Sequence, residues 1–198
     1  MSQLTLTLLS GGLRHINMKE KLLTIDRKTI LFPVALIVLA VIMRLLPHLP
    51  NVTPLAAMAL TGSLYMERKY AFILPLSALF LSDLLLGFHD TMVFVYAGFL
   101  ITGVIGLWIK KKYSLKRVVS GTLLSSFIFF LLTNAGVWLV SSMYEKTFLG
   151  LMQSYTMALP FLRNSVLGDL GYTLAFVFIY NGALFLAHKK AFLLRNTV

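Results

Sequence analysis

The sequence contains no cysteine and few charged residues. The lack of cysteine excludes disulfides, thiolate zinc sites, iron–sulfur clusters and a cysteine nucleophile. Charged residues make up 13% of the 198 positions, whereas soluble domains carry about 25%. Hydrophobic residues reach 58%, and the mean hydropathy is +0.83. Because so large an apolar excess must be shielded from water, this composition excludes an ordinary soluble domain.

Six apolar runs approach the length of about 20 residues that crosses a bilayer as a helix. They are Ile30–Leu46, Val52–Met66, Phe72–Phe88, Met92–Ile109, Val118–Val140 and Val166–Ala187. The runs are continuous and lack alternation at every second residue, which favours helices over strands. We therefore expect an all-α membrane protein with six transmembrane helices over residues 30–188. The stretch Phe148–Leu159 is too short to span and is followed by Pro160, so it predicts an interfacial or re-entrant helix before the sixth span.

The positive charges predict the orientation of these spans. Fifteen of the eighteen lysines and arginines lie in the N-terminal segment, in the second-to-third and fourth-to-fifth connections, or in the C-terminal tail. The exceptions are Arg44, Lys146 and Arg163. Under the positive-inside rule both termini are cytoplasmic, and we expect a multi-pass protein of the bacterial cytoplasmic membrane. Topology thereby explains the net charge of +11, and we expect no nucleic-acid partner.

The two ends of the chain are expected to lie in the cytoplasm. Residues 1–29 form an N-terminal segment without the order of charges, apolar stretch and cleavage site of a secretory signal. Both Met1 and Met18 are candidates for its start, and a disordered segment is one reading of it. Residues 189–198 form a basic tail.

Polar and aromatic residues gather in the outer half of the predicted bundle. Asp83 and Asp169 lie inside apolar runs, where a charge is costly and faces a cavity or a partner. Asp83 can pair with Arg44 or Arg163, and Asp169 either with a base from another span or with a ligand. We expect a pocket that opens outward. The candidate ligand-binding residues are Asn51, Asp83, His89, Tyr96, Asn134, Trp138, Tyr155, Arg163, Asn164 and Asp169.

Structural roles compete with ligand binding at several of these positions. Asn51 can cap the helix whose first turn Pro54 occupies. His89 can simply be a loop residue at the water boundary. Trp138 and Tyr155 can stack on a planar ligand, yet such residues also form the aromatic belts at membrane interfaces. These alternatives stay open at the level of the sequence.

Motifs for catalysis and for cofactors are missing. Asp83 and Asp169 invite comparison with paired catalytic carboxylates, but Ser82-Asp83 and Gly168-Asp169 both depart from the intramembrane aspartyl protease pattern. The sequence has neither a His-Glu-x-x-His zinc motif nor a Walker loop. We therefore expect no enzymatic activity, no cofactor and no bound metal.

Three short motifs carry a resemblance to a known class of membrane protein. They are Asn51-x-Thr53-Pro54, Ser82-Asp83 with Gly87-Phe88-His89, and Pro160-Phe161 with Gly168-Asp169. Together with six spans over residues 30–188, they resemble the substrate-binding S components of energy-coupling factor (ECF) transporters. More narrowly, they look like a family of uncharacterised bacterial membrane proteins that is grouped with S components.

This resemblance implies a transport function. A vitamin-like small molecule would bind from outside, beneath the loops after the first, third and fifth spans. The protein would dock onto a transmembrane coupling subunit that carries two ATPases. Cobalamin is one of the open ligands, with His89 as a cobalt ligand, whereas the absence of a Met-His start disfavours a bare metal ion as substrate.

Two other functions stay open. In a solitary transporter or channel, Asp83 and Asp169 would carry protons. In a scaffold subunit, the same helices would pack against partner proteins without binding any small ligand.

Overall fold

The structure, a computed structural model, describes residues 27–195, and this range folds into six α-helices without a β-strand. The helices are α2 (Arg27–Leu45), α3 (Leu55–Tyr65), α4 (Tyr70–Leu86), α5 (Met92–Lys110), α6 (Leu115–Val140) and α7 (Phe148–Arg195). The prediction of an all-α chain is confirmed. Most of the predicted N-terminal segment 1–29 and the last three residues of the predicted tail lie outside the described residues.

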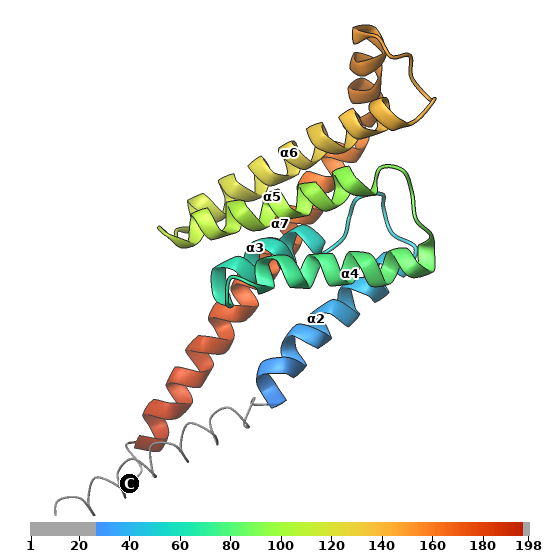
Figure 1. The fold of residues 1–198 in the computed structure, drawn as a ribbon. Helices are drawn as coiled ribbons and strands as arrows, with labels where there is room; N and C mark the ends of the chain where they lie inside the picture. The colour runs from blue at the N-terminus through green and yellow to red at the C-terminus, as the bar shows by residue number, and fades with distance from the viewer. Residues whose placement is uncertain (1–26, 196–198) are drawn as a thin grey trace, which may run out of the picture. The chain divides into compact units, whose positions relative to one another are not determined.

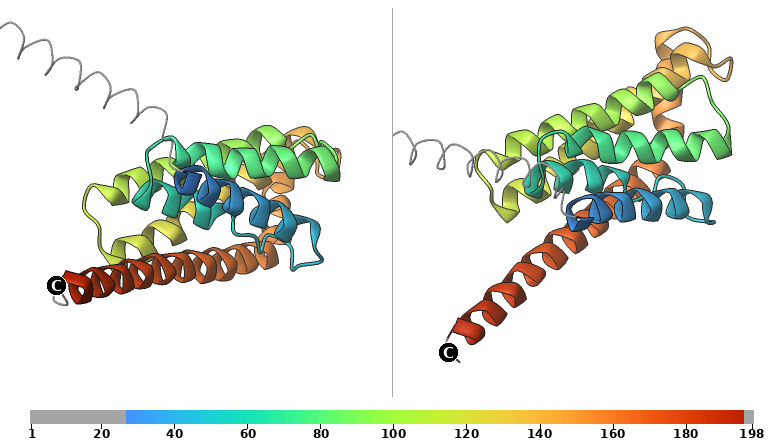
Figure 2. Two further views of the ribbon diagram at one scale, coloured as in Figure 1. Left: turned by 90° about the horizontal axis from the view of Figure 1, so that it is seen from below. Right: turned by 60° about the horizontal axis from the view of Figure 1, so that its bottom comes forward.

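Two units, Met1–Ala35 and Leu36–Val198, divide the chain. Of the first unit, only the start of α2 belongs to the described residues. The second unit holds the rest of α2 and helices α3 to α7 (Figure 1). Within it, α3 contacts α4, α5, α6 and α7, and α5, α6 and α7 pack in sequence against one another (Figure 2).

Helix α3 is short and almost fully enclosed. It has 11 residues, and the ten from Leu55 to Leu64 are buried. Small side chains let α5 approach closely, so that Ser63 Oγ donates a hydrogen bond to the carbonyl of Gly103 at 2.9 Å. A Cβ added to Gly106 would lie only 2.6 Å from the same hydroxyl. At 1.5 Å per residue, α3 is about half as long as a bilayer-spanning helix.

Within residues 27–195, three helices are long and apolar enough to cross a membrane: α5, α6 and the Phe148–Leu186 part of α7. Pro33–Leu45, α3 and α4 are also apolar but have only 10–17 residues. Large hydrophobic side chains stand exposed on the outer helix faces, as Leu85 on α4 and Phe178 on α7 do. These features are those of a helical membrane protein, while the six-span topology and the orientation stay predictions.

The prediction that Pro160 separates an interfacial helix from the last span is wrong. Helix α7 continues from Phe148 through Pro160 to Arg195, so Phe148–Leu159 and Val166–Ala187 belong to one element. Proline removes one backbone donor and crowds the preceding turn, which a long helix absorbs locally. In apolar surroundings, ending the helix would leave several more backbone groups without partners.

A matched pair of glycine variants tests the close packing of α3 against α5. Gly106→Ala places a Cβ against Ser63 and 3.1 Å from the Leu60 Cα, and we expect a loss of about 1–3 kcal/mol of stability from overpacking. Gly171→Ala meets nothing within 4 Å, and alanine's better helix propensity should leave stability equal or higher. Thermal unfolding of the full-length protein in detergent, followed by circular dichroism, measures both. Equal melting temperatures for the two variants would contradict the packing described.

Candidate functional site

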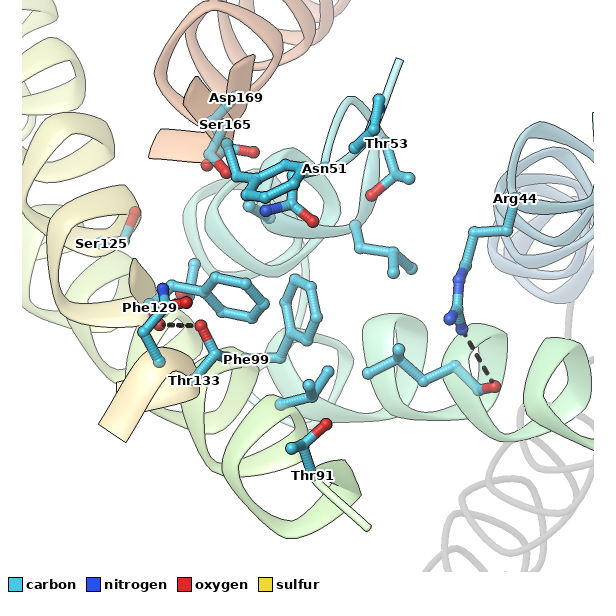
Figure 3. Close-up of a pocket in the computed structure, with 18 of the residues that line it drawn as sticks. Arg44, Asn51, Thr53, Thr91, Phe99, Ser125, Phe129, Thr133, Ser165 and Asp169 are labelled. Atoms are coloured by element: carbon cyan, nitrogen blue, oxygen red, sulfur yellow. Dashed lines mark hydrogen bonds between the residues drawn. The ribbon is translucent and has the colours of Figure 1, made fainter. Parts of the chain in front are cut away.

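A cavity of about 470 Å³ lies inside the second unit (Figure 3). Its walls come from the α2–α3 connection, the end of α4 and the adjoining loop, and from α5, α6 and α7. The polar lining residues include Arg44, His48, Asn51, Thr53, His89, Thr91, Thr102, Ser125, Thr133, Asn134, Ser165 and Asp169. The apolar lining residues include Leu55, Ala56, Leu79, Val95, Phe99, Phe129, Val137 and Phe161. A few placed polar groups on apolar walls are typical of small-molecule sites.

Two helices each present one regular face to the cavity. The lining positions are four residues apart on α6 (Ser125, Phe129, Thr133) and on α7 (Phe161, Ser165, Asp169). Residues four apart share a face of a helix, so a single stripe of each helix supplies hydroxyls, aromatic rings and a carboxylate. The Phe129 ring is held against α5, because a Cβ on Gly98 would lie 2.6 Å from its Cδ2 atom.

The start of α3 opens onto the cavity. Asn51 has a positive φ of 65°, a conformation that asparagine tolerates better than most residues. Helix α3 begins at Leu55 after Pro54, and no side chain of the N-cap residue accepts a bond from its first turn. Of the two roles left open for Asn51, the structure does not show capping, because Pro54 is the N-cap residue and the left-handed turn leads Asn51 to the cavity wall. The first backbone N–H groups of any helix lack intrahelical acceptors, and here Leu55 and Ala56 line the cavity.

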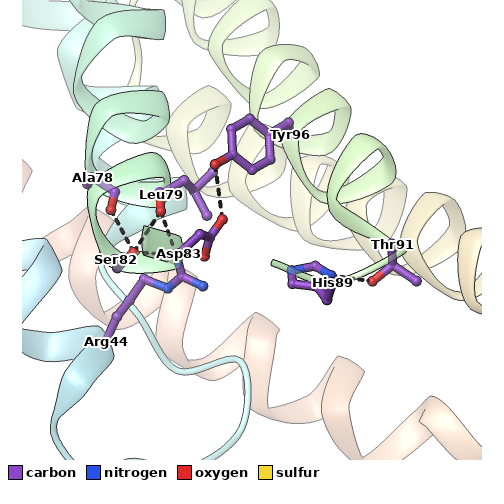
Figure 4. Close-up of polar contacts among 8 residues, drawn as sticks. All are labelled: Arg44, Ala78, Leu79, Ser82, Asp83, His89, Thr91 and Tyr96. Atoms are coloured by element: carbon purple, nitrogen blue, oxygen red, sulfur yellow. Dashed lines mark hydrogen bonds and ion pairs between the residues drawn. The ribbon is translucent and has the colours of Figure 1, made fainter. Parts of the chain in front are cut away.

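An ion pair joins α2 to α4 beside the cavity (Figure 4). Arg44 Nη1 lies 2.8 Å from Asp83 Oδ1 and also donates hydrogen bonds to Ser82 Oγ and to the carbonyl of Leu79. Tyr96 OH on α5 donates to the other oxygen of Asp83 at 3.0 Å. The Asp83 side chain is only 1% exposed, so both of its oxygens are engaged within the protein. Of the two bases that the sequence offered as partners, the structure selects Arg44.

The second buried carboxylate has a different environment. Asp169 on α7 is 7% exposed and lines the cavity. Its Oδ2 atom accepts a hydrogen bond from Ser126 Oγ on α6 at 2.7 Å. Among the side chains that the structure describes, the ion pairs are Arg44–Asp83 and Lys69–Glu67, so no basic side chain in that set neutralises Asp169.

The structure brings four of the ten candidate residues together in the cavity wall. These are Asn51, His89, Asn134 and Asp169. Asn134 bonds through its amide nitrogen to the carbonyl of Phe130, and His89 Nδ1 lies 2.8 Å from Thr91 Oγ1.

The other six candidates lie outside the wall. Asp83 and Tyr96 form the buried cluster with Arg44. Trp138 donates its indole N–H to the carbonyl of Glu145, and Tyr155 donates its hydroxyl to the carbonyl of Leu131. Arg163 is exposed and Asn164 is half-buried, and neither lines the cavity.

Sequence reasoning missed the hydroxyl and phenylalanine part of the wall. Thr133, Ser125, Ser165, Phe99 and Phe129 are common residue types in membrane helices, and none stands out alone. The signal that could have found them is the spacing of four residues to a polar candidate, as between Ser165 and Asp169. Among the described residues, no group of three histidine, cysteine or acidic side chains is placed to hold a metal ion.

Fold and cavity together define the class: an all-helical membrane protein with a polar and partly aromatic cavity. The chain belongs to DUF6580, a family of unknown function, whose sequence profile matches residues 25–192. No curated protein and no solved structure shows a significant match to the chain.

A double-mutant cycle tests the Arg44–Asp83 pair. Asp83→Leu leaves the Arg44 guanidinium without a negative partner, and Arg44→Met leaves the Asp83 carboxylate without a positive partner. We expect each single variant to lose about 3–5 kcal/mol, and the double variant to recover most of that loss. Thermal unfolding of the full-length protein in detergent measures the cycle. Strictly additive losses would show that the two side chains do not interact.

Proposed function

We propose that the protein is a substrate-capture subunit for the uptake of a small, vitamin-like nutrient, working with an ATP-driven coupling module. The cavity is the observation that carries the proposal. About 470 Å³ is in the range of pockets that enclose small organic ligands. Its lining combines hydroxyls, amides, aromatic rings and a buried carboxylate.

The resemblance to S components supports the same function independently of the cavity. All three motifs that carry it contribute residues to the cavity wall, namely Asn51 and Thr53, His89, and Phe161 with Asp169. In the second of these motifs, Asp83 also pairs with Arg44, which lines the cavity. The transmembrane coupling subunit with two ATPases, onto which S components dock, belongs to the proposal as its partner.

The distribution of basic residues supports an outward-facing cavity. Lys110 Nζ donates a hydrogen bond to the carbonyl of Met66 at 2.8 Å, so the α3–α4 and α5–α6 connections meet at one end of the bundle. These connections are the basic ones. His89 and Thr91, which line the cavity, lie at the other ends of α4 and α5. With the basic end in the cytoplasm, the predicted six-span topology has both termini inside and the cavity toward the exterior.

One feature disfavours the solitary proton-coupled transporter. A proton carrier needs a carboxylate that can release its ion-pair partner or face water. Asp83 is instead enclosed between Arg44 and Tyr96. Of the two acids, only Asp169 then remains as a candidate proton carrier. Uptake that follows the proton gradient without any ATPase would nevertheless favour that function over ligand capture for a coupling module.

Single-cysteine labelling tests the proposed topology, since the chain has no cysteine of its own. We expect a membrane-impermeant maleimide to label Asp90→Cys in intact cells, because the loop between α4 and α5 faces outward. It should label Lys111→Cys only after permeabilisation. Gel-shift of the labelled protein measures both. Labelling of position 111 from outside would reverse the orientation and overturn the outward-facing cavity.

Native mass spectrometry of gently purified protein tests ligand capture. We expect a small organic molecule to co-purify with the wild type and to fall about tenfold in occupancy in Thr133→Trp, because the indole fills part of the cavity. Thr133 Oγ1 bonds only within its own helix, to the carbonyl of Phe129 at 2.8 Å, so the substitution removes no contact between helices.

Thr156→Trp is the matched control. Thr156 is exposed on α7, lies outside the cavity and makes the same kind of bond, to the carbonyl of Met152 at 2.8 Å. It should retain the ligand. If no molecule co-purifies and the melting temperature is unchanged across a panel of vitamins, the protein is a ligand-free scaffold and the proposal fails.

A further inference from the structure

Among the side chains that the structure describes, no base pairs with the Asp169 carboxylate in the cavity wall. Arg44 and Asp83 neutralise each other at 2.8 Å. Asp169 adds a carboxylate that is 7% exposed and receives one neutral hydrogen bond, from Ser126. A carboxylate shielded from water in this way is costly unless a positive group or a proton accompanies it.

The start of α3 offsets this charge only in part. A Cβ on Gly168 would lie 3.2 Å from the Val52 Cα, so α7 touches the chain just before α3 begins. A helix N-terminus is equivalent to about half a positive charge, and its effect fades within the first turn. Arg163, six residues before Asp169 on α7, is exposed and does not line the cavity. A positive group beside Asp169, or a proton on it, is thus not supplied by the described side chains.

The aromatic residues of the cavity wall also favour a positively charged ligand. Phe99 and Phe129 both line the cavity, with ring centroids 5.0 Å apart and planes inclined by 53°. The faces of such rings attract cations and accept flat apolar groups. Neither ring face attracts an anionic ligand, and the Asp169 carboxylate would repel one.

Building on the capture function proposed above, we propose that the ligand is a monocation: a flat, largely apolar ring that carries a protonated nitrogen. The nitrogen donates to Asp169, and the ring lies against Phe99 and Phe129. Arg44, already neutralised by Asp83, offers its remaining N–H groups to an uncharged oxygen of the ligand. An acidic ligand of the same size would be rejected by the Asp169 charge.

Three probes of nearly equal size separate charge from shape. Benzamidine is a planar cation, benzamide is neutral and benzoate is an anion. Calorimetric titration of the dialysed full-length protein should show benzamidine binding about tenfold more tightly than benzamide, and no benzoate binding. In Asp169→Asn, which retains an acceptor for Ser126, the affinities for benzamidine and benzamide should agree within about twofold.

Two control variants keep the experiment decisive. Asp90→Asn removes the same formal charge from an exposed loop position outside the cavity wall, and it should preserve the preference for benzamidine. Ser126→Ala removes the hydrogen bond but keeps the carboxylate, and it should preserve the preference as well. Should Asp169→Asn fail to fold, the selectivity of the wild type among the three probes still decides the question.

The two proposals fail in different ways. Equal or tighter binding of benzamide or benzoate by the wild type, with a ligand still lost from Thr133→Trp, overturns the cation assignment and leaves capture intact. No preference for benzamidine in the absence of any co-purified ligand overturns both. Loss of the preference in Asp90→Asn as well as in Asp169→Asn would show a general charge effect, and would also overturn the assignment.

Discussion

The arrangement around the cavity depends on where helix α3 starts. With only 11 residues, α3 ends well short of a bilayer-spanning length, and the chain reaches it through the left-handed turn at Asn51. A buried helix start leaves backbone donors facing inward, and side chains of the five other described helices line the cavity at that point. The cavity lies where they do so. The small residues of α3 that pack against α5, such as Ser63 at Gly103, fix this position along the bundle axis.

The two buried aspartates have separate roles because their surroundings differ. Asp83 is engaged by Arg44 and Tyr96, so it ties α2 and α5 to α4 and leaves no net charge. Asp169 meets only a hydroxyl of Ser126 and faces the open space. The same residue type therefore stabilises the wall in one place and gives the cavity its electrostatic character in the other.

Helix type and position followed from the sequence where hydrophobicity was continuous. The expected spans Met92–Ile109 and Val118–Val140 nearly coincide with α5 and α6. The prediction that the helix ends at Pro160 was wrong. It considered the local cost of a proline to the helix backbone but not the cost of ending a helix in apolar surroundings. At the site, polarity inside apolar runs identified Asp169 and Asn134. Polarity alone could not decide whether Arg44 or Arg163 pairs with Asp83. It also could not identify Ser125 or Phe129 as lining residues, because both questions depend on which helix faces meet in space.

Helix α7 carries Phe161, Ser165 and Asp169 on its cavity face and continues without interruption to Arg195. Its proline lies before these residues, so the stretch after Asp169 contains no residue that breaks the backbone hydrogen-bond ladder. Eleven residues after Asp169, Tyr180 stacks on Tyr65 at the end of α3, with ring centroids 4.0 Å apart. An unbroken helical segment therefore connects the Asp169 carboxylate in the cavity wall to the aromatic contact with the end of α3. A rotation of α7 at one of these points would also move the other.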